Sequence, residues 1–233
     1  KDPTISPLRY TDYVHLAWLF TPTIQRMLVV GLGAGSIPKR FLVDYPQVSI
    51  ESVELDPLVA EVARTYFAVA DDPRHRIIVQ DGRQYVRRAE GRYDMVLMDA
   101  YFAEGIPFHL VTREFFEQLK AKLTPGGVVV ANTYAAEFAG LYLFPVGFST
   151  GKEEETTRTI LLFATERPGV TRDALAARLT TLLAGKKVSE LVTRSFLRDY
   201  YERPVTTGDV PEFTDDYAPV DILPVYGWEP ERR

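Results

Sequence analysis

The sequence RMLVVGLGAGSIPKRFLVD, residues 26–44, begins with an apolar run, passes through closely spaced glycines and ends in an amphipathic segment. The run Arg26–Gly31 predicts a buried strand, and the apolar spacing of Ser36–Asp44 predicts a helix. Glycines at such a turn permit positive φ and bring backbone N–H groups close to a ligand. The stretch is typical of the first strand–turn–helix unit of a nucleotide-binding α/β domain, although such a turn also serves plain packing.

The same alternation of strand-like and amphipathic stretches continues to residue 132. Further strands are predicted at Val48–Glu54, Arg76–Gln80, Tyr93–Asp99 and Gly127–Asn132. Helices are predicted at Pro57–Phe67, Gly82–Arg88 and Thr112–Leu123, with a stop and turn at Thr124–Gly127. Such alternation favours a parallel sheet with crossover helices.

Beyond residue 140 the pattern changes. The runs LYLFPVG (141–147) and RTILLFATE (158–166), separated by the polar STGKEEET, predict an antiparallel hairpin. Helical spacing returns at Thr171–Leu183 and Val188–Tyr201, ahead of an acidic, proline-containing tail. We therefore predict an α/β fold with a doubly wound, mostly parallel sheet, a C-terminal antiparallel hairpin and a helical tail.

We interpret residues 1–233 as a single catalytic-type domain. Its parts are an N-terminal helical segment (1–22), a nucleotide-binding sheet (23–165) and C-terminal helices with a tail (166–233).

Composition narrows the function classes. The net charge of −5 and the pI of about 5.4 do not favour nucleic acid as a partner, so a small-molecule partner is expected. The chain has no cysteine, which excludes disulfides, thiolate nucleophiles and cysteine-based zinc sites, and we predict no metal site. No apolar run approaches the roughly 20 residues of a membrane span. We expect a cytoplasmic protein, and a fragment of a longer protein is an open alternative.

Acidic residues follow three of the predicted strands, at the edge where ligands bind such sheets. Glu54 lies roughly 20 residues past the glycines, as expected of a residue that binds ribose hydroxyls. Asp81, with Gly82, is placed to accept from an adenine amino group, and Asp99 to face the reacting centre. For Asp81, and for Asp56 beside the site, capping of a helix is the more frequent single role.

A nicotinamide-dependent dehydrogenase shares the strand, the glycine turn and the acidic residue. It normally has a third glycine where this chain has Ser36, and it gives no reason for Asp81-Gly82 or for the hairpin. It is kept as a distant alternative.

Five segments together resemble the catalytic domain of the spermidine synthase family over roughly residues 10–134. They are VVGLGAGSIPKRFL, SVELDPLVAEVARTYF, DPRHRIIVQDGRQYVRR, YDMVLMDA and VTREFFEQLKAKLTPGGVVV. The tail DDYAPVDIL resembles the branch of this family that is often fused to membrane transporter segments.

The resemblance implies a bound S-adenosylmethionine or its decarboxylated form. The cofactor-binding residues would be Gly31, Gly33, Ala34, Gly35, Glu54, Leu55, Asp81, Gly82 and Asp99. The segment PLRYTDYVHLAWL would form an acceptor-side wall, with His15 matching a family histidine. Related enzymes commonly form dimers or tetramers, so a homodimer is expected.

The chain departs from the family at two acidic positions. Family members resemble GGGDGG in the glycine loop, and the aspartate there, which binds the aminopropyl arm, is replaced by Ala34. They also resemble D-S-T-D-P after the fourth strand, where the second aspartate takes the proton from the attacking amine. This chain has Asp99-Ala100-Tyr101-Phe102-Ala103, with Phe102 at the position of that aspartate. The small Ala34 leaves room for the carboxylate of intact S-adenosylmethionine, which favours methyl transfer.

The leading prediction is therefore methyl transfer to a small-molecule acceptor, with amines among the candidates. An aminopropyltransferase with relocated acidic residues (Glu104, Glu137 or a tail aspartate such as Asp215 or Asp216) is the alternative, and a non-catalytic nucleotide-binding domain is a further one. The predicted catalytic residues are Asp99, Tyr101, Glu104 and His15, with His109 a further candidate base. Of the nearby aromatic residues, which include Tyr10, only Tyr101 is favoured as pocket wall; core is the more frequent place for the others.

Overall fold

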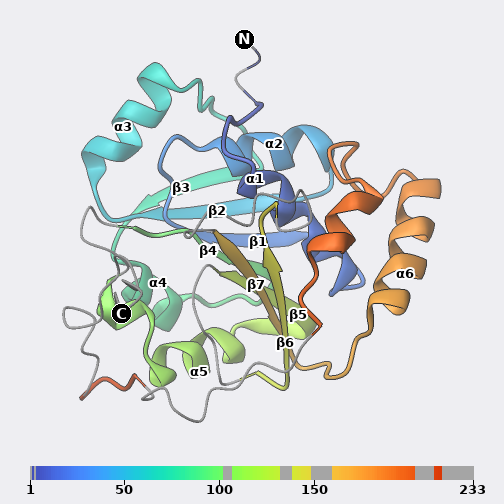
Figure 1. Cartoon of the computed structure of the whole chain (residues 1–233). Coiled ribbons are helices and arrows are strands. Elements are labelled where there is room, and N and C mark those ends of the chain that lie inside the picture. The colour runs from blue at the N-terminus through green and yellow to red at the C-terminus, as the bar shows by residue number, and fades with distance from the viewer. Residues whose placement is uncertain are drawn as a thin grey trace, which may run out of the picture.

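The computed structural model describes residue 2 and residues 4–101, 107–131, 138–147, 159–202 and 213–216. Within these ranges seven strands form one sheet in the order β3-β2-β1-β4-β5-β7-β6 (Figure 1). The strands are β1 (Arg26–Val30), β2 (Ser49–Glu54), β3 (His75–Val79), β4 (Tyr93–Met98), β5 (Leu123–Ala131), β6 (Gly140–Pro145) and β7 (Ile160–Thr165).

Strand pairing confirms the predicted sheet. Strands β1 to β5 pair in parallel, and β7 pairs antiparallel with both β5 and β6. The register aligns Val30 with Val53 and with Met98, so the ends of β1, β2 and β4 meet at one edge. The acidic residues that follow these strands are brought together there.

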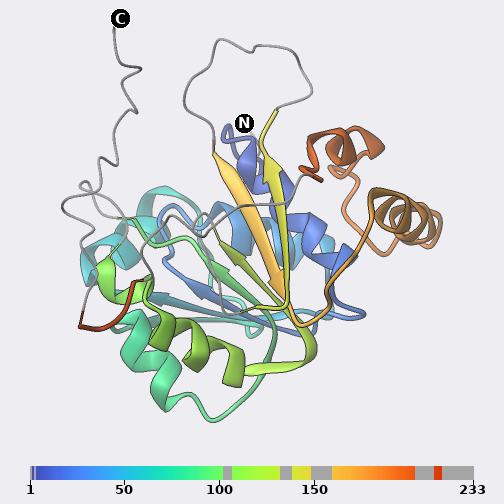
Figure 2. The same cartoon turned by 60° about the horizontal axis from the view of Figure 1, so that its bottom comes forward.

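Helices cover both faces of the sheet. They are α1 (Tyr10–Tyr13), η1 (Val14–Leu19, 3₁₀), α2 (Ser36–Asp44), α3 (Pro57–Tyr66), α4 (Gly82–Arg88), η2 (Phe108–Leu110, 3₁₀), α5 (Arg113–Ala121), α6 (Arg172–Ala184) and η4 (Arg194–Asp199, 3₁₀). Figure 2 shows α4 and α5 on one face, with α2, α6 and the N-terminal helices on the other.

The alternation of side chains along β1 explains the two layers. Met27 and Val29 pack into the core beneath α2, η1 and α6, whereas Leu28 and Val30 pack into the core beneath α4 and α5. Successive strand residues point to opposite faces, so a continuously apolar strand needs cover on both sides.

Two predicted elements differ in the structure. The segment predicted as a helix over Val188–Tyr201 forms only the 3₁₀ helix η4, because Ser189 makes a local turn. Its Oγ accepts from the N–H of Leu191 at 3.3 Å, and its own N–H donates to Tyr45 Oη at 3.0 Å. The predicted turn at Thr124–Gly127 lies inside β5, as an irregularity in its register against β4.

Within the described ranges, every helix falls short of the length and apolarity that a membrane span requires.

Candidate active site

The glycine turn after β1 brings the backbone against the end of β4. Gly31 has φ +96°, and a Cβ at this position would lie 2.4 Å from the carbonyl oxygen of Asp99. Its N–H donates to the carbonyl of Val53 at 2.8 Å, which ties the turn to β2. Only glycine fits this position, because both the positive φ and the close approach exclude a side chain.

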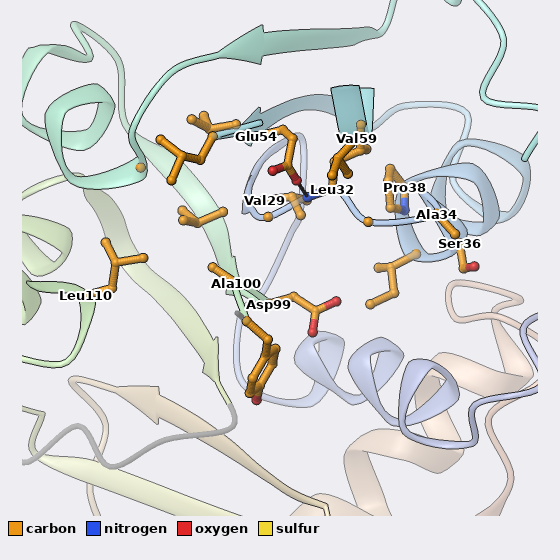
Figure 3. A pocket seen from close by; sticks show the side chains of 18 of the residues that line it. Val29, Leu32, Ala34, Ser36, Pro38, Glu54, Val59, Asp99, Ala100 and Leu110 are labelled. Atoms are coloured by element: carbon orange, nitrogen blue, oxygen red, sulfur yellow. Dashed lines mark hydrogen bonds between the residues drawn. The ribbon is translucent and has the colours of Figure 1, made fainter. Parts of the chain in front are cut away.

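Glu54, at the end of β2, holds the turn in place. Its Oε2 accepts from the N–H of Leu32 at 2.9 Å (Figure 3). Its Oε1 accepts from the N–H of Asp56 at 3.1 Å. A carboxylate has about four acceptor positions, so two are left for a ligand diol. Asp56 caps α3 by accepting from Leu58 N at 2.8 Å, as predicted.

Asp81 lies between β3 and α4 and forms part of the site together with His109. Its Oδ1 accepts from the N–H of Gln84 at 2.8 Å and so caps α4, which confirms the predicted capping role. Its Oδ2 lies 2.8 Å from Nε2 of His109, a residue of η2. The next residue, Gly82, packs so tightly that a Cβ would lie 2.5 Å from Val30 Cγ1.

Asp99, directly after β4, pairs with a tyrosine from the N-terminal segment. The hydroxyl of Tyr10 lies 3.1 Å from Oδ2 and 3.3 Å from Oδ1 of Asp99. Burial raises the pKa of the Asp99 carboxyl to about 6, although the Tyr10 hydrogen bond opposes the rise. Burial and the adjacent carboxylate also raise the pKa of the Tyr10 phenol, which keeps that hydroxyl a donor. A carboxylate with a pKa near 6 is suited to accept a proton near neutral pH.

These groups surround one cavity of about 410 Å³ at the carboxyl ends of the parallel strands. Figure 3 shows the side chain of Glu54 above the glycine turn and that of Asp99 below it. Three carboxylates line the cavity, those of Glu54, Asp81 and Asp99, and none of its described lining residues is lysine or arginine. The cavity therefore favours a ligand with positive charge.

Most of the predicted cofactor-binding residues line this cavity. They are Gly31, Gly33, Ala34, Glu54, Leu55, Asp81, Gly82 and Asp99. Gly35 does not; it is the residue before α2, with φ +64° and its N–H bonded to the carbonyl of Leu32. Tyr101 lines the cavity with its side chain 48% exposed. Glu104 lies outside the described residues.

His15 is a correction. We predicted it on the acceptor-side wall, but the structure places it in the core with 1% of its surface exposed. Its Nδ1 lies 2.8 Å from Tyr45 Oη, and its ring stacks on Phe41 at a centroid distance of 4.5 Å. Burial lowers the pKa of the imidazole, so His15 is neutral here and packs α2 against η1.

The contacts of two residues of the site are not predicted by local sequence patterns. The sequence places Tyr10 in the acceptor-wall segment but favours the core for its ring, whereas the structure places its hydroxyl beside Asp99, 89 positions away. His109, a candidate base from the sequence, lines the cavity and lies beside Asp81. Both contacts join separate segments, and no local pattern predicts such pairs.

The sheet and its cavity define the chain as a Rossmann-like α/β domain with an acidic site at the carboxyl ends of its strands. The chain belongs to the family of the spermine/spermidine synthase domain, whose sequence model matches residues 9–140. It is similar to the polyamine aminopropyltransferase of Vibrio vulnificus (strain CMCP6), with 40% identity over 132 residues, 54% of this chain and 44% of that protein. The chain thus spans less than half the length of that relative.

Two solved structures show the same fold. A spermidine synthase in complex with the transition state analogue AdoDATO has a TM-score of 0.65 at 20% identity, covering 84% of this chain and 71% of that one. Human methyltransferase-like protein 13 in complex with SAH has a TM-score of 0.60 at 22% identity, covering 87% and 95%.

Proposed function

We propose that this domain transfers an aminopropyl group from decarboxylated S-adenosylmethionine to an amine. The observation that carries the proposal is the charge of the cavity, with three lining carboxylates and no lysine or arginine among its described lining residues. The name of the Vibrio vulnificus relative supports the same activity. This proposal replaces methyl transfer as our leading interpretation.

Charge separates the two forms of the cofactor. Intact S-adenosylmethionine carries a carboxylate beside its ammonium and sulfonium groups, whereas the decarboxylated form carries only the two cations. A carboxylate in an acidic cavity is repelled, while a cation within about 4–6 Å of a carboxylate is stabilised. The small side chain of Ala34 leaves volume for the carboxylate of S-adenosylmethionine, but the negative charge of the surrounding carboxylates opposes its binding more strongly.

Asp99 is the proposed general base. The acceptor amine attacks the carbon of the aminopropyl chain that is bonded to the sulfonium. The bond between this carbon and sulfur breaks, and its electron pair stays on sulfur. The products are 5′-methylthioadenosine and an aminopropylated amine, whose released proton goes to Asp99. The pKa of about 6 leaves Asp99 largely ionised at pH 7–8, which this role requires.

Tyr10 and Glu54 have supporting roles. The Tyr10 hydroxyl orients the Asp99 carboxylate from the N-terminal side. Glu54 already accepts from two backbone N–H groups of the site, and its remaining lone pairs face a ribose diol.

Methyl transfer is the second candidate function. The hydroxyl residues Ser6 and Ser36 line the cavity together with Ala34, and hydroxyl groups donate hydrogen bonds to a carboxylate. A cofactor carboxylate would therefore have donors in spite of the acidic surroundings.

The products distinguish the candidates. The purified domain is incubated with putrescine and other diamines and with either form of the cofactor, and the nucleoside product is identified by chromatography. We expect 5′-methylthioadenosine from the decarboxylated form and no turnover of S-adenosylmethionine. S-adenosylhomocysteine as the main product would establish methyl transfer instead, and tight binding without any product would support the non-catalytic alternative.

A further inference from the structure

Residues 213–216 lie against the start of α5 (Figure 2, red). The carbonyl of Phe213 accepts from the N–H of Arg113 at 2.8 Å. The N–H of Asp215 donates to Glu114 Oε2 at 3.0 Å. These two backbone contacts, at Phe213 and at Asp215 itself, hold Asp215 against the start of α5.

The Asp215 carboxylate forms a two-pronged ion pair with Arg83. Arg83 Nη1 donates to Oδ1 and Nη2 donates to Oδ2, each at 2.6 Å. The hydroxyl of Thr112, which is fully buried at the cap of α5, donates to Oδ1 at 2.8 Å. A bidentate arginine–carboxylate pair fixes orientation as well as distance.

Arg83 continues the chain of contacts to the cavity. Its Nη1 also donates to the carbonyl of His109 at 3.2 Å. The imidazole of His109 lies 2.8 Å from Asp81 Oδ2, and both of these residues line the cavity. Arg83 itself follows Gly82, another lining residue.

We infer that Asp215 is a positioning residue for nucleotide binding, acting through Arg83 on the cavity wall formed by His109 and Asp81. We name the unit formed by Phe213, Asp215 and Arg83 the C-terminal clasp. Asp81 follows β3 and Asp99 follows β4, and the sheet order places β2 and β1 between these two strands. The clasp therefore sets the part of the site that would hold the adenine base rather than the reacting centre. The chemical identity of that ligand, an adenosine derivative, rests on the proposed function; the contacts of the clasp do not.

The first test needs no ligand. The chain has three histidines, so the ring signals of His109 are followed by NMR in wild type, Asp215→Ala and Asp216→Ala, with His15 and His75 as internal references. Asp216 is the neighbouring exposed carboxylate and serves as the matched control. We expect Asp215→Ala to shift the signals of His109 alone and Asp216→Ala to shift none. Unchanged His109 signals in Asp215→Ala would overturn the inference.

The second test measures binding of 5′-methylthioadenosine, S-adenosylmethionine and decarboxylated S-adenosylmethionine by calorimetry, well below the unfolding temperature. Asp215→Ala should weaken all three about 3- to 10-fold, with kcat changed less than twofold, because the shared adenosine part is affected. In an Arg83→Gln background the same substitution should have no further effect, since Asp215 acts through Arg83. Asp215→Asn, which keeps the side-chain volume, replaces Asp215→Ala if that variant fails to fold.

The outcomes separate the two proposals. Wild-type affinity in Asp215→Ala would overturn the clasp and leave the transferase activity untouched. If the wild-type domain binds none of the three nucleosides, the proposed function fails, and the His109 signals alone decide whether the clasp positions the wall.

Discussion

The two halves of the site are built in different ways. The proposed nucleotide half comes from β1, the glycine turn and the last residue of β2, Glu54, which accepts from the backbone N–H of Leu32 only 22 positions away. The proposed acceptor half joins Asp99 to Tyr10 across 89 positions. Local contacts make the first half a robust scaffold, whereas the second half depends on the whole chain being folded. Changes in the first should therefore affect affinity, and changes in the second should affect turnover.

The largest expected effect is from Asp99→Asn. The variant keeps the volume of the side chain and an acceptor for Tyr10, but loses the proposed base, so kcat should fall about 10²- to 10⁴-fold. Nucleoside affinity should change far less. Steady-state kinetics and calorimetry on the same preparation measure both, and a variant that keeps full turnover would remove Asp99 from the mechanism.

The pH dependence of the wild-type reaction tests whether Asp99 acts in its ionised form. The folded pKa of Asp99, about 6, is raised above the ordinary value, so the carboxylate is protonated at pH 5 and ionised at pH 8. The kcat/KM should rise with pH through about 6. Because burial disfavours the ionised form, Asp99 lowers the stability of the fold above pH 6, where its carboxyl is charged. Asp99→Asn should therefore raise the free energy of unfolding above pH 6 by about 1–3 kcal/mol and leave it unchanged at pH 4.

Glu54→Gln tests the nucleotide half. The amide keeps the length of the side chain but offers fewer acceptors, so affinity for 5′-methylthioadenosine should fall about 10- to 100-fold while kcat at saturation changes little. Glu61→Gln, an exposed position on the neighbouring α3, is the matched control and should bind like wild type. Equal affinity in both variants would contradict the ribose assignment.

Tyr10→Phe should have a smaller effect on the acceptor half. Loss of one hydrogen bond is worth about 0.5–1.5 kcal/mol, or a several-fold fall in kcat. The hydrogen bond from Tyr10 lowers the pKa of Asp99, so its removal should move the midpoint of the pH profile upward. Tyr66→Phe, 76% exposed, is the control. A midpoint that moves downward would contradict the assigned donor role of Tyr10.

His15→Ala should leave the kinetics of the folded enzyme nearly unchanged. Its buried ring packs on Phe41 and pairs with Tyr45, so its removal should lower the free energy of unfolding by about 2–4 kcal/mol. Chemical denaturation and KM for the amine, measured side by side, check this. A raised KM for the amine without loss of stability would contradict the structural role and support the placement of His15 on the acceptor-side wall.

Sequence reasoning reached the nucleotide half because its signals are local. The apolar run, the glycines and Glu54 follow one another at the spacing typical of a nucleotide-binding unit. The parallel order of the strands then brings Asp81 and Asp99 to the same edge of the sheet. Tyr10 and His15 lie in one short N-terminal segment, and one faces the cavity while the other is buried. The packing of η1 against α2 determines which of the two side chains is buried. The spacing of apolar residues in the sequence does not predict this packing. The pairing of Asp215 with Arg83 is equally beyond local patterns.

The central claim is that the acidic cavity selects the decarboxylated form of the cofactor. Two parallel titrations test it most directly. The domain is titrated by calorimetry with decarboxylated S-adenosylmethionine and with S-adenosylmethionine at pH 8. We predict tighter binding of the decarboxylated form, with a preference that shrinks in Asp99→Asn and at pH 5, where the carboxyl is neutral. Tighter binding of intact S-adenosylmethionine would contradict the electrostatic argument and restore methyl transfer as the leading function.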